Sequence, residues 1–254
     1  MSLLTGADLI YNVKKYFSPS REELEAFLIA VVAMTVIVGF NDQSLGSFRL
    51  GFWLTNFIIC AIIIFLCATV FVSSQRIFAL WWGYRTEFKI FYPGLAVGLM
   101  LTLMTFGLYP IFWWLGTHGI QVQMIEAQRL GYFRYFVRIW DVAIIALMGP
   151  ISLLLLALIF RIFYFLPSVE TLQLAVKICV LYAGYQMLPI PPLAGHNIFF
   201  ASRWLYFLVF GLILGFGFLI QNPHIPLIIS LFLTFIAGIV MVFFYVKVID
   251  AKLM

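Results

Sequence analysis

The chain has 254 residues, of which 65% are hydrophobic and only 10% are charged. Soluble domains carry about 25% charged residues, so this composition excludes an ordinary water-soluble domain and predicts that lipid covers most of the surface. The net charge of +5 is scattered over short loops without a basic stripe. This distribution argues against a nucleic-acid partner and favours contact with lipid head groups.

Residues 1–15 are too polar for a secretory signal peptide, because Asp8, Lys14 and Lys15 interrupt any apolar core. No cleaved targeting segment is expected, and the mixture of apolar and basic residues predicts an interfacial N-terminal segment over residues 1–21. The stretch Ser18-Pro19-Ser20 resembles a helix cap, and Glu22 and Glu23 follow it in what would be the first turn. A helix is therefore predicted to begin at about residue 22.

The rest of the chain, residues 22–254, is predicted to be a single transmembrane domain. A spanning helix needs about 20 mostly apolar residues, and backbone surrounded by lipid must be helical. Six segments satisfy this requirement and a seventh is less clear-cut: about 22–41, 52–82, 93–115, 140–166, 171–188, 203–220 and 226–248. The expected fold is therefore all-α, a polytopic transmembrane helical bundle of six to seven spans.

Basic residues divide six against seven between the two sides of these spans, so the positive-inside rule leaves the orientation open. We expect a cytoplasmic N-terminus and a location in the cell (plasma) membrane. The longest connection, 118–138, carries arginines among aromatic residues and is predicted to lie at the membrane interface.

Several single residues interrupt the apolar pattern or stand out within it. Cys60, Cys67 and Cys179 lie in apolar runs and are expected to be buried small hydrophobic residues rather than disulfide partners or metal ligands. Arg76 lies near the end of a predicted span, where a long side chain is expected to extend to the interface.

Conventional catalytic sets are missing from the sequence. A catalytic zinc site needs His, Cys or carboxylate ligands with one open position, and its usual helical form is HExxH. The histidines, His118, His196 and His224, have no pair at helical ligand spacing. Asp141 has no second aspartate for an aspartyl protease, and no sequence context supports a Ser–His pair. Zinc is therefore not expected.

The most informative motif is proline-rich and lies at the end of the fifth predicted span. It reads Gln186-Met187-Leu188-Pro189-Ile190-Pro191-Pro192-Leu193-Ala194-Gly195-His196. Prolines lack the backbone donor that a helix needs, so a partly unwound segment is predicted at 188–195. This stretch resembles the Asn-x-x-Pro-x-x-Pro-Leu-Asp-Gly segment of the site-2 proteases, intramembrane zinc metalloproteases, and the chain is most similar to their small archaeal-type members.

Two further segments carry the same resemblance. The stretch 148–153 is similar to the family's Ala-Gly-Pro-x-x-Asn segment, with Leu153 at the Asn position. The stretch 83–88 is similar to the family's residues on the C-terminal side of HExxH. Counting back from it identifies the degenerate active-site positions. These are Phe71, Val72 and Gln75 for His, Glu and His, Gln186 for Asn, and Ala194 for the ligand Asp.

The resemblance implies a site-2-protease-like core over about 52–200 in which the zinc ligands and the general base are absent. It also implies a groove that holds a partner helix, with these candidate residues: Pro189, Pro191, Pro192, Leu193, Gly195 and His196. Non-helical backbone at membrane depth is tolerated only where it is buried in protein or lines a cavity.

Three functions are compatible with the sequence. The first is a catalytically inactive protein, a pseudoprotease, that binds another transmembrane protein as a regulator or as a subunit of a membrane complex. The second is an intramembrane metalloprotease with a rearranged site that uses His118, His196 or His224. The third is a small transporter or channel built on the unwound segment.

Overall fold

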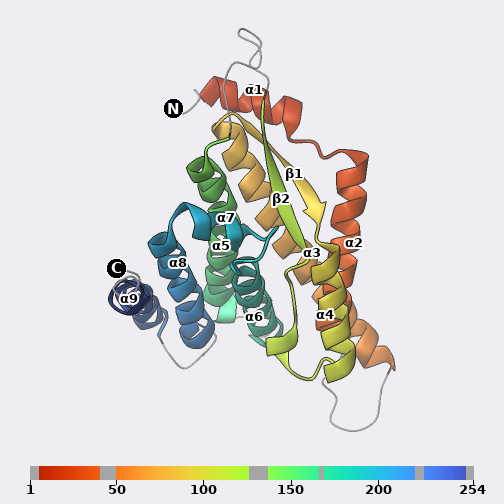
Figure 1. Ribbon diagram of the computed structural model, residues 1–254. Coiled ribbons are helices and arrows are strands. Elements are labelled where there is room, and N and C mark those ends of the chain that lie inside the picture. Colours follow the sequence, from red (N-terminus) through yellow and green to blue (C-terminus); the bar gives the residue numbers. More distant parts are fainter. Residues whose placement is uncertain (1–5, 41–49, 126–136, 166–168, 221–225, 250–254) are drawn as a thin grey trace.

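The computed structural model describes residues 6–40, 50–125, 137–165, 169–220 and 226–249, and these are mostly helical (Figure 1). The helices are α1 (Gly6–Tyr16), α2 (Arg21–Gly39), α3 (Leu50–Trp81), α4 (Tyr92–Thr105), α5 (Ile139–Ile162), α6 (Val169–Gln186), α7 (Ala194–Ala201), α8 (Arg203–Gly215) and α9 (Leu227–Phe244). Two strands, β1 (Tyr84–Ile90) and β2 (His118–Met124), complete the regular structure. The predicted predominance of helix is thus confirmed.

Three of the described helices are long and apolar enough to cross a membrane: α3, α5 and the segment Leu227–Lys247 that contains α9. The shorter helices α4 and α8 are apolar but do not reach spanning length, and α2 begins with a run of charged residues. By length and composition, the described helices therefore do not reach the predicted six to seven spans.

The predicted span 93–115 is shorter than expected. Helix α4 ends at Thr105, because Phe106 and Gly107 both have positive φ angles, of 50° and 66°. This left-handed backbone closes the helix by sending the Gly107 N–H back to the Thr102 carbonyl, at 3.1 Å. The chain then runs back toward β2 through a short turn of 3₁₀ helix, Pro110–Phe112.

The core lies where α3, α5 and α6 pack together, with α7 against α5 (Figure 1). Its side chains come from these four helices, from α2 and α8, and from the segment before β2. Cys60, Cys67 and Cys179 are all buried, as the sequence predicted. The Cys67 and Cys179 sulfurs lie 3.3 Å apart, which brings α3 and α6 into direct contact.

The two-stranded antiparallel sheet was not predicted. Tyr84 pairs with Met124 and Ile90 with His118, and β1 also packs on α2 and α3 (Figure 1). Along β1 the buried side chains alternate with more exposed ones, as a sheet with one covered face requires. The Tyr84 hydroxyl donates a hydrogen bond to Asp141 of α5, at 2.6 Å.

Helix α9 lies at one side of the molecule and packs mainly on α8 and the π-helical turn Phe216–Ile220. Glycines allow this close approach. A Cβ added to Gly211 would lie 2.9 Å from the Cα of Gly238, and one added to Gly215 would lie 2.9 Å from the Cα of Thr234. The outer face of α9 is apolar and open, with Ile228 79% exposed.

Candidate functional site

The positions identified from the family resemblance lie on α3, α5, α6 and α7, and two of them, Phe71 and Gln186, both contact His118 in the core. Phe71 of α3 is fully buried and stacks on Tyr182 of α6, with ring centroids 5.2 Å apart. The Phe71 ring also makes a T-shaped contact with the ring of His118, the first residue of β2, with centroids 5.4 Å apart. Gln186, at the end of α6, closes the group. We call Phe71, His118, Tyr182 and Gln186 the His118 cluster.

Polar contacts of His118 organise this cluster. Its Nε2 is 3.0 Å from the Tyr182 hydroxyl, and the Gln186 amide donates to the His118 carbonyl at 3.3 Å. The imidazole also stacks on Phe88 of β1, with centroids 4.7 Å apart. Burial lowers the pKa of His118 to about 3, because removal from water disfavours the imidazolium. His118 is therefore a neutral, hydrogen-bonded part of the core at physiological pH.

Gln75 lies one helical turn beyond Phe71 and faces α5. Its amide nitrogen donates to the Ala146 carbonyl at 3.0 Å, while its buried Oε1 has no hydrogen-bond partner in the part of the chain that the structure describes. Both side chains pack over Gly149. A Cβ at Gly149 would lie 2.6 Å from the Gln75 amide nitrogen and would clash with the Phe71 ring. Gly149 therefore creates the space that Phe71 and Gln75 fill.

Two serines join the same pair of helices. The Ser74 hydroxyl lies 3.0 Å from the Ser152 hydroxyl and 3.2 Å from the Met148 carbonyl, and Ser152 donates to the Gly149 carbonyl at 2.7 Å. These hydroxyls act as a polar link between α3 and α5.

The proline-rich segment is unwound over residues 187–193, and a helix resumes at Ala194, before the end of the predicted stretch. Its Pro191–Pro192 peptide bond is cis. Gly119 of β2 lies against the Pro192 carbonyl and Gly195 against the Met187 carbonyl, so closely that a Cβ at either glycine would clash.

The candidate groove residues divide by exposure. Pro189 and Pro191 are exposed, whereas Leu193 and Gly195 are buried, and Pro192 and His196 are half-buried. The exposed surface of the segment is therefore Pro189–Pro191, including Ile190, which is 40% exposed.

The remaining predicted positions lie around this segment. Ala194 is buried in the same hydrophobic cluster as Phe71. Val72 instead faces the side of α3 that looks toward α2. The His196 ring packs at a tilt of 55° against Phe200, with centroids 4.7 Å apart, and its buried Nδ1 has no hydrogen-bond partner among the described residues. His224 lies outside the described residues.

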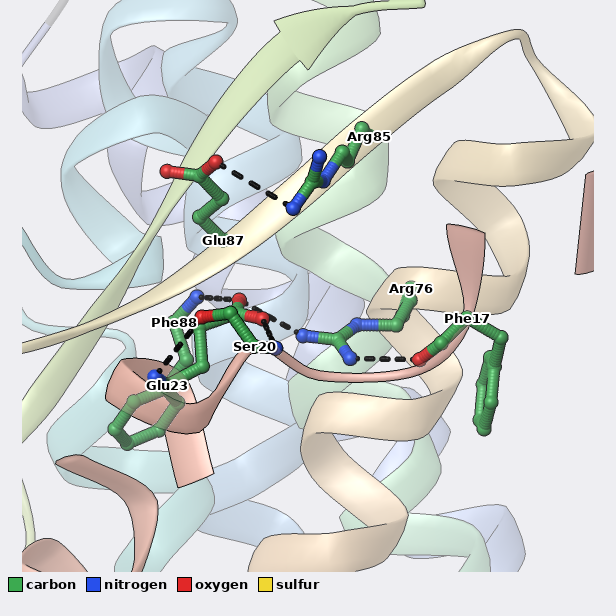
Figure 2. Close-up of polar contacts among 7 residues, drawn as sticks. All are labelled: Phe17, Ser20, Glu23, Arg76, Arg85, Glu87 and Phe88. Atoms are coloured by element: carbon green, nitrogen blue, oxygen red, sulfur yellow. Dashed lines mark hydrogen bonds and ion pairs between the residues drawn. The ribbon is translucent and has the colours of Figure 1, made fainter. Parts of the chain in front are cut away.

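A second polar centre lies between α2, α3 and β1, and it corrects the expectation for Arg76. Arg76 does not extend to the interface; it is buried and forms an ion pair with Glu23 of α2, at 3.0 Å (Figure 2). The same Glu23 oxygen accepts the Phe88 N–H of β1 at 2.9 Å, and Arg76 donates to the Phe17 carbonyl at 2.8 Å. Glu23 and Ser20 form the reciprocal cap of α2.

An apolar pocket of about 410 Å³ borders this ion pair. Its walls come from α2, α3 and β1, and they include Phe27, Phe65 and Val72. The pocket therefore lies on the opposite side of Val72 from the core, and a side chain at position 72 is accessible from it.

The central position of His118 was not predicted from the sequence, because the residue was expected to begin an interfacial connection. The residue is instead the first of a strand whose burial depends on pairing with β1, and single-sequence hydropathy contains no signal for that pairing. Among the described residues, no three His, Cys, Asp or Glu side chains form a group that could hold a metal ion.

Comparison with known proteins does not extend these observations, because no family model, no curated protein and no solved structure matches the chain.

Proposed function

We propose that this chain is an integral membrane protein with a site-2-protease-like core, catalytically inactive, that binds another transmembrane protein as a regulator or complex subunit. One observation supports this proposal above all. Three segments identified by resemblance, at 71–75, 148–153 and 186–195, pack around one another in the core although more than 100 residues separate the first from the last.

The chemistry at their meeting point supports the inactive form. Phe71 stacks on Tyr182 in the position assigned to a zinc ligand, and Gln75 donates to a backbone carbonyl in the position assigned to another. Both side chains contribute to packing. The histidine that contacts Phe71, His118, is held by Tyr182 and Gln186.

The membrane location and the remaining spans belong to the same proposal. The apolar composition and the helices α3, α5 and α9 support it. We infer that α2, α4, α6 and α8 add to the three longer helices to give six to seven spans. Helices α2 and α6 carry charged residues but are partly covered by protein, and a helix covered in this way needs less apolar surface of its own.

Restoring the missing ligands tests the resemblance directly. A variant with Phe71→His, Val72→Glu, Gln75→His and Ala194→Asp should bind one zinc ion per chain, because positions 71 and 75 lie one turn apart on α3. The matched control keeps Ala194 and so lacks the third ligand. We expect at least about tenfold weaker zinc binding by that control. A folded fourfold variant that binds zinc no better than the native chain would contradict the shared core.

Photo-crosslinking tests the partner. A crosslinking amino acid at Ile190, on the exposed part of the unwound segment, should capture one defined transmembrane polypeptide in cell membranes. The same group at Ile228, which is more exposed but lies on α9, is the control and should not capture that polypeptide. Equal capture from both positions would contradict a specific partner site at 189–191. Stoichiometric zinc in the native protein would reopen the enzymatic alternative.

A further inference from the structure

A large cavity among the described residues lies away from the His118 cluster. It has a volume of about 900 Å³ and lies between the first turns of α3 and the first turns of α6. Its lining is mixed rather than apolar. Thr55 from α3 and Gln173 from α6 contribute polar groups, and Phe52 and Ile59 contribute apolar walls. A cavity of this size accommodates a small molecule or a lipid head group.

Two opposite charges line this cavity at different depths. Glu170 lies in the first turn of α6 and Lys177 lies seven residues further along, which is two turns and about 10 Å along the helix axis. Residues seven apart lie on the same face of a helix, so both side chains are directed to the same cavity. Glu170 is exposed at the mouth and Lys177 is half-buried.

Lys177 has no acidic partner among the described residues. The ion pairs there join Arg76 to Glu23 and Arg85 to Glu87, and neither includes Lys177. An ammonium group two turns inside a helix at membrane depth requires an anion or water to compensate for its lost hydration. The cavity supplies space for such an anion next to the charge.

The order of groups along the cavity selects the class of ligand. From the start of α6 inward, the wall offers a carboxylate, then an ammonium, with apolar side chains beside them. A zwitterionic phospholipid has the complementary order from water inward, with its own ammonium outermost, then the phosphate, then the acyl chains. An anionic phospholipid such as phosphatidylglycerol also offers a phosphate to Lys177 but lacks the outer ammonium, so Glu170 gains no partner from it.

We propose that the cavity between α3 and α6 binds the head group of a zwitterionic phospholipid, with the phosphate at Lys177 and the ammonium at Glu170. The proposal rests on the membrane location proposed above and does not depend on the protease resemblance. It assigns Lys177 a ligand and explains why a lysine without an acidic partner among the described residues lines a cavity there.

Lipid titration of the delipidated full chain, followed by native mass spectrometry, tests this site. The probes are phosphatidylethanolamine and phosphatidylglycerol with identical acyl chains, and inorganic phosphate. We expect phosphatidylethanolamine to bind at least about tenfold more tightly than phosphatidylglycerol, a difference of about 1.4 kcal/mol. Comparable binding of the two lipids by the native chain would overturn the proposal. Binding of phosphate alone as tightly as of the lipid would also overturn it and would define a free-anion site.

Three variants make the assignment specific. Lys177→Gln should weaken binding of both lipids, and that of phosphatidylethanolamine about tenfold, because the phosphate loses its partner. Glu170→Gln should weaken only phosphatidylethanolamine and so reduce or abolish the preference. Lys89→Gln, which removes one charge from an exposed position on β1, is the matched control and should bind like the native chain. If Lys177→Gln and Glu170→Gln behave like Lys89→Gln, the lipid site is refuted.

Failure of this experiment and failure of the membrane proposal can be distinguished. Reconstitution into lipid nanodiscs, with protection of α3 and α5 from hydrogen exchange, reports the membrane location by itself. A chain that inserts but shows no head-group preference refutes only the lipid site.

Discussion

Replacing Arg76 by Met is expected to destabilise the protein more than removal of an exposed charge. The Arg76 and Glu23 side chains are only 8% and 10% exposed, and their charged atoms lie 3.0 Å apart. Arg76→Met would leave the Glu23 carboxylate buried without its counter-charge and the Phe17 carbonyl without its donor. Removing one partner of a buried ion pair costs about 3–5 kcal/mol.

The lower end of that range applies to Arg76, because two backbone N–H groups, those of Phe88 and Ser20, continue to bind the carboxylate. We therefore expect a loss of about 3 kcal/mol in the free energy of unfolding. The double variant Glu23→Gln with Arg76→Met should be less destabilised than Arg76→Met alone, since no uncompensated charge then remains.

The chain supplies a matched control on β1. Arg85 and Glu87 lie 3.8 Å apart with side chains 39% and 26% exposed, so Arg85→Met should cost less than about 1 kcal/mol (Figure 2). Reversible unfolding in mixed detergent micelles, followed by tryptophan fluorescence, measures both variants. If Arg76→Met and Arg85→Met differ by less than about 1 kcal/mol, the reasoning from burial is refuted.

Three further predictions concern the core. The pKa of His118 is lowered to about 3 in the folded chain. The contribution of the neutral imidazole to the free energy of unfolding is therefore fully present above pH 6.5 and is lost as the pH falls from 6.5 toward 3. The decline in the free energy of unfolding should approach about 1.4 kcal/mol per pH unit and be absent from His118→Gln; parallel pH profiles of unfolding would contradict this. Tyr182→Phe should lower the free energy of unfolding by about 1 kcal/mol through loss of the hydrogen bond to His118, and an unchanged unfolding midpoint would show that this bond contributes nothing. Gly195→Ala should reduce the yield of folded protein in detergent because its Cβ clashes with the Met187 carbonyl, whereas Gly184→Ala, whose Cβ finds only an ordinary contact at 3.7 Å, should not; similar yields would contradict the clash.

The helices were largely predictable from the sequence because apolar run length and terminal signals are local. The predicted helices at 52–82, 140–166 and 171–188 correspond to α3, α5 and α6 within a few residues. The cap at Ser20 also follows from local chemistry, since the serine and Glu23 bind each other's backbone N–H groups.

The strands were missed although β1 carries a local signal. From Tyr84 to Ile90, apolar and Thr side chains alternate with Arg85, Glu87 and Lys89, which is the period of a half-buried strand. The expectation of helices alone rests on the rule that backbone within lipid must be helical. That rule does not hold where protein covers the strands, and α2 and α3 pack on β1.

The composition of the His118 cluster was not predictable for a different reason. The sequence identified Phe71 and Gln186 as positions of interest but gave no indication that residue 118 lies between them. That contact depends on β1–β2 pairing and on the close approach of Gly119 to Pro192. Both are long-range contacts, and periodicity in a single segment contains no information about them.

The buried ion pair also constrains the order in which the chain can mature. Glu23 precedes Arg76 by 53 residues, so during synthesis α2 is complete well before its counter-charge has been made. Until α3 follows, the carboxylate has only the positive end of its own helix and nearby backbone N–H groups to stabilise it. Helix α2 can therefore complete its packing around Glu23 only after α3 has been made. Under the proposal that α2 is one of the spans, the two helices should enter the membrane as a pair rather than one after the other.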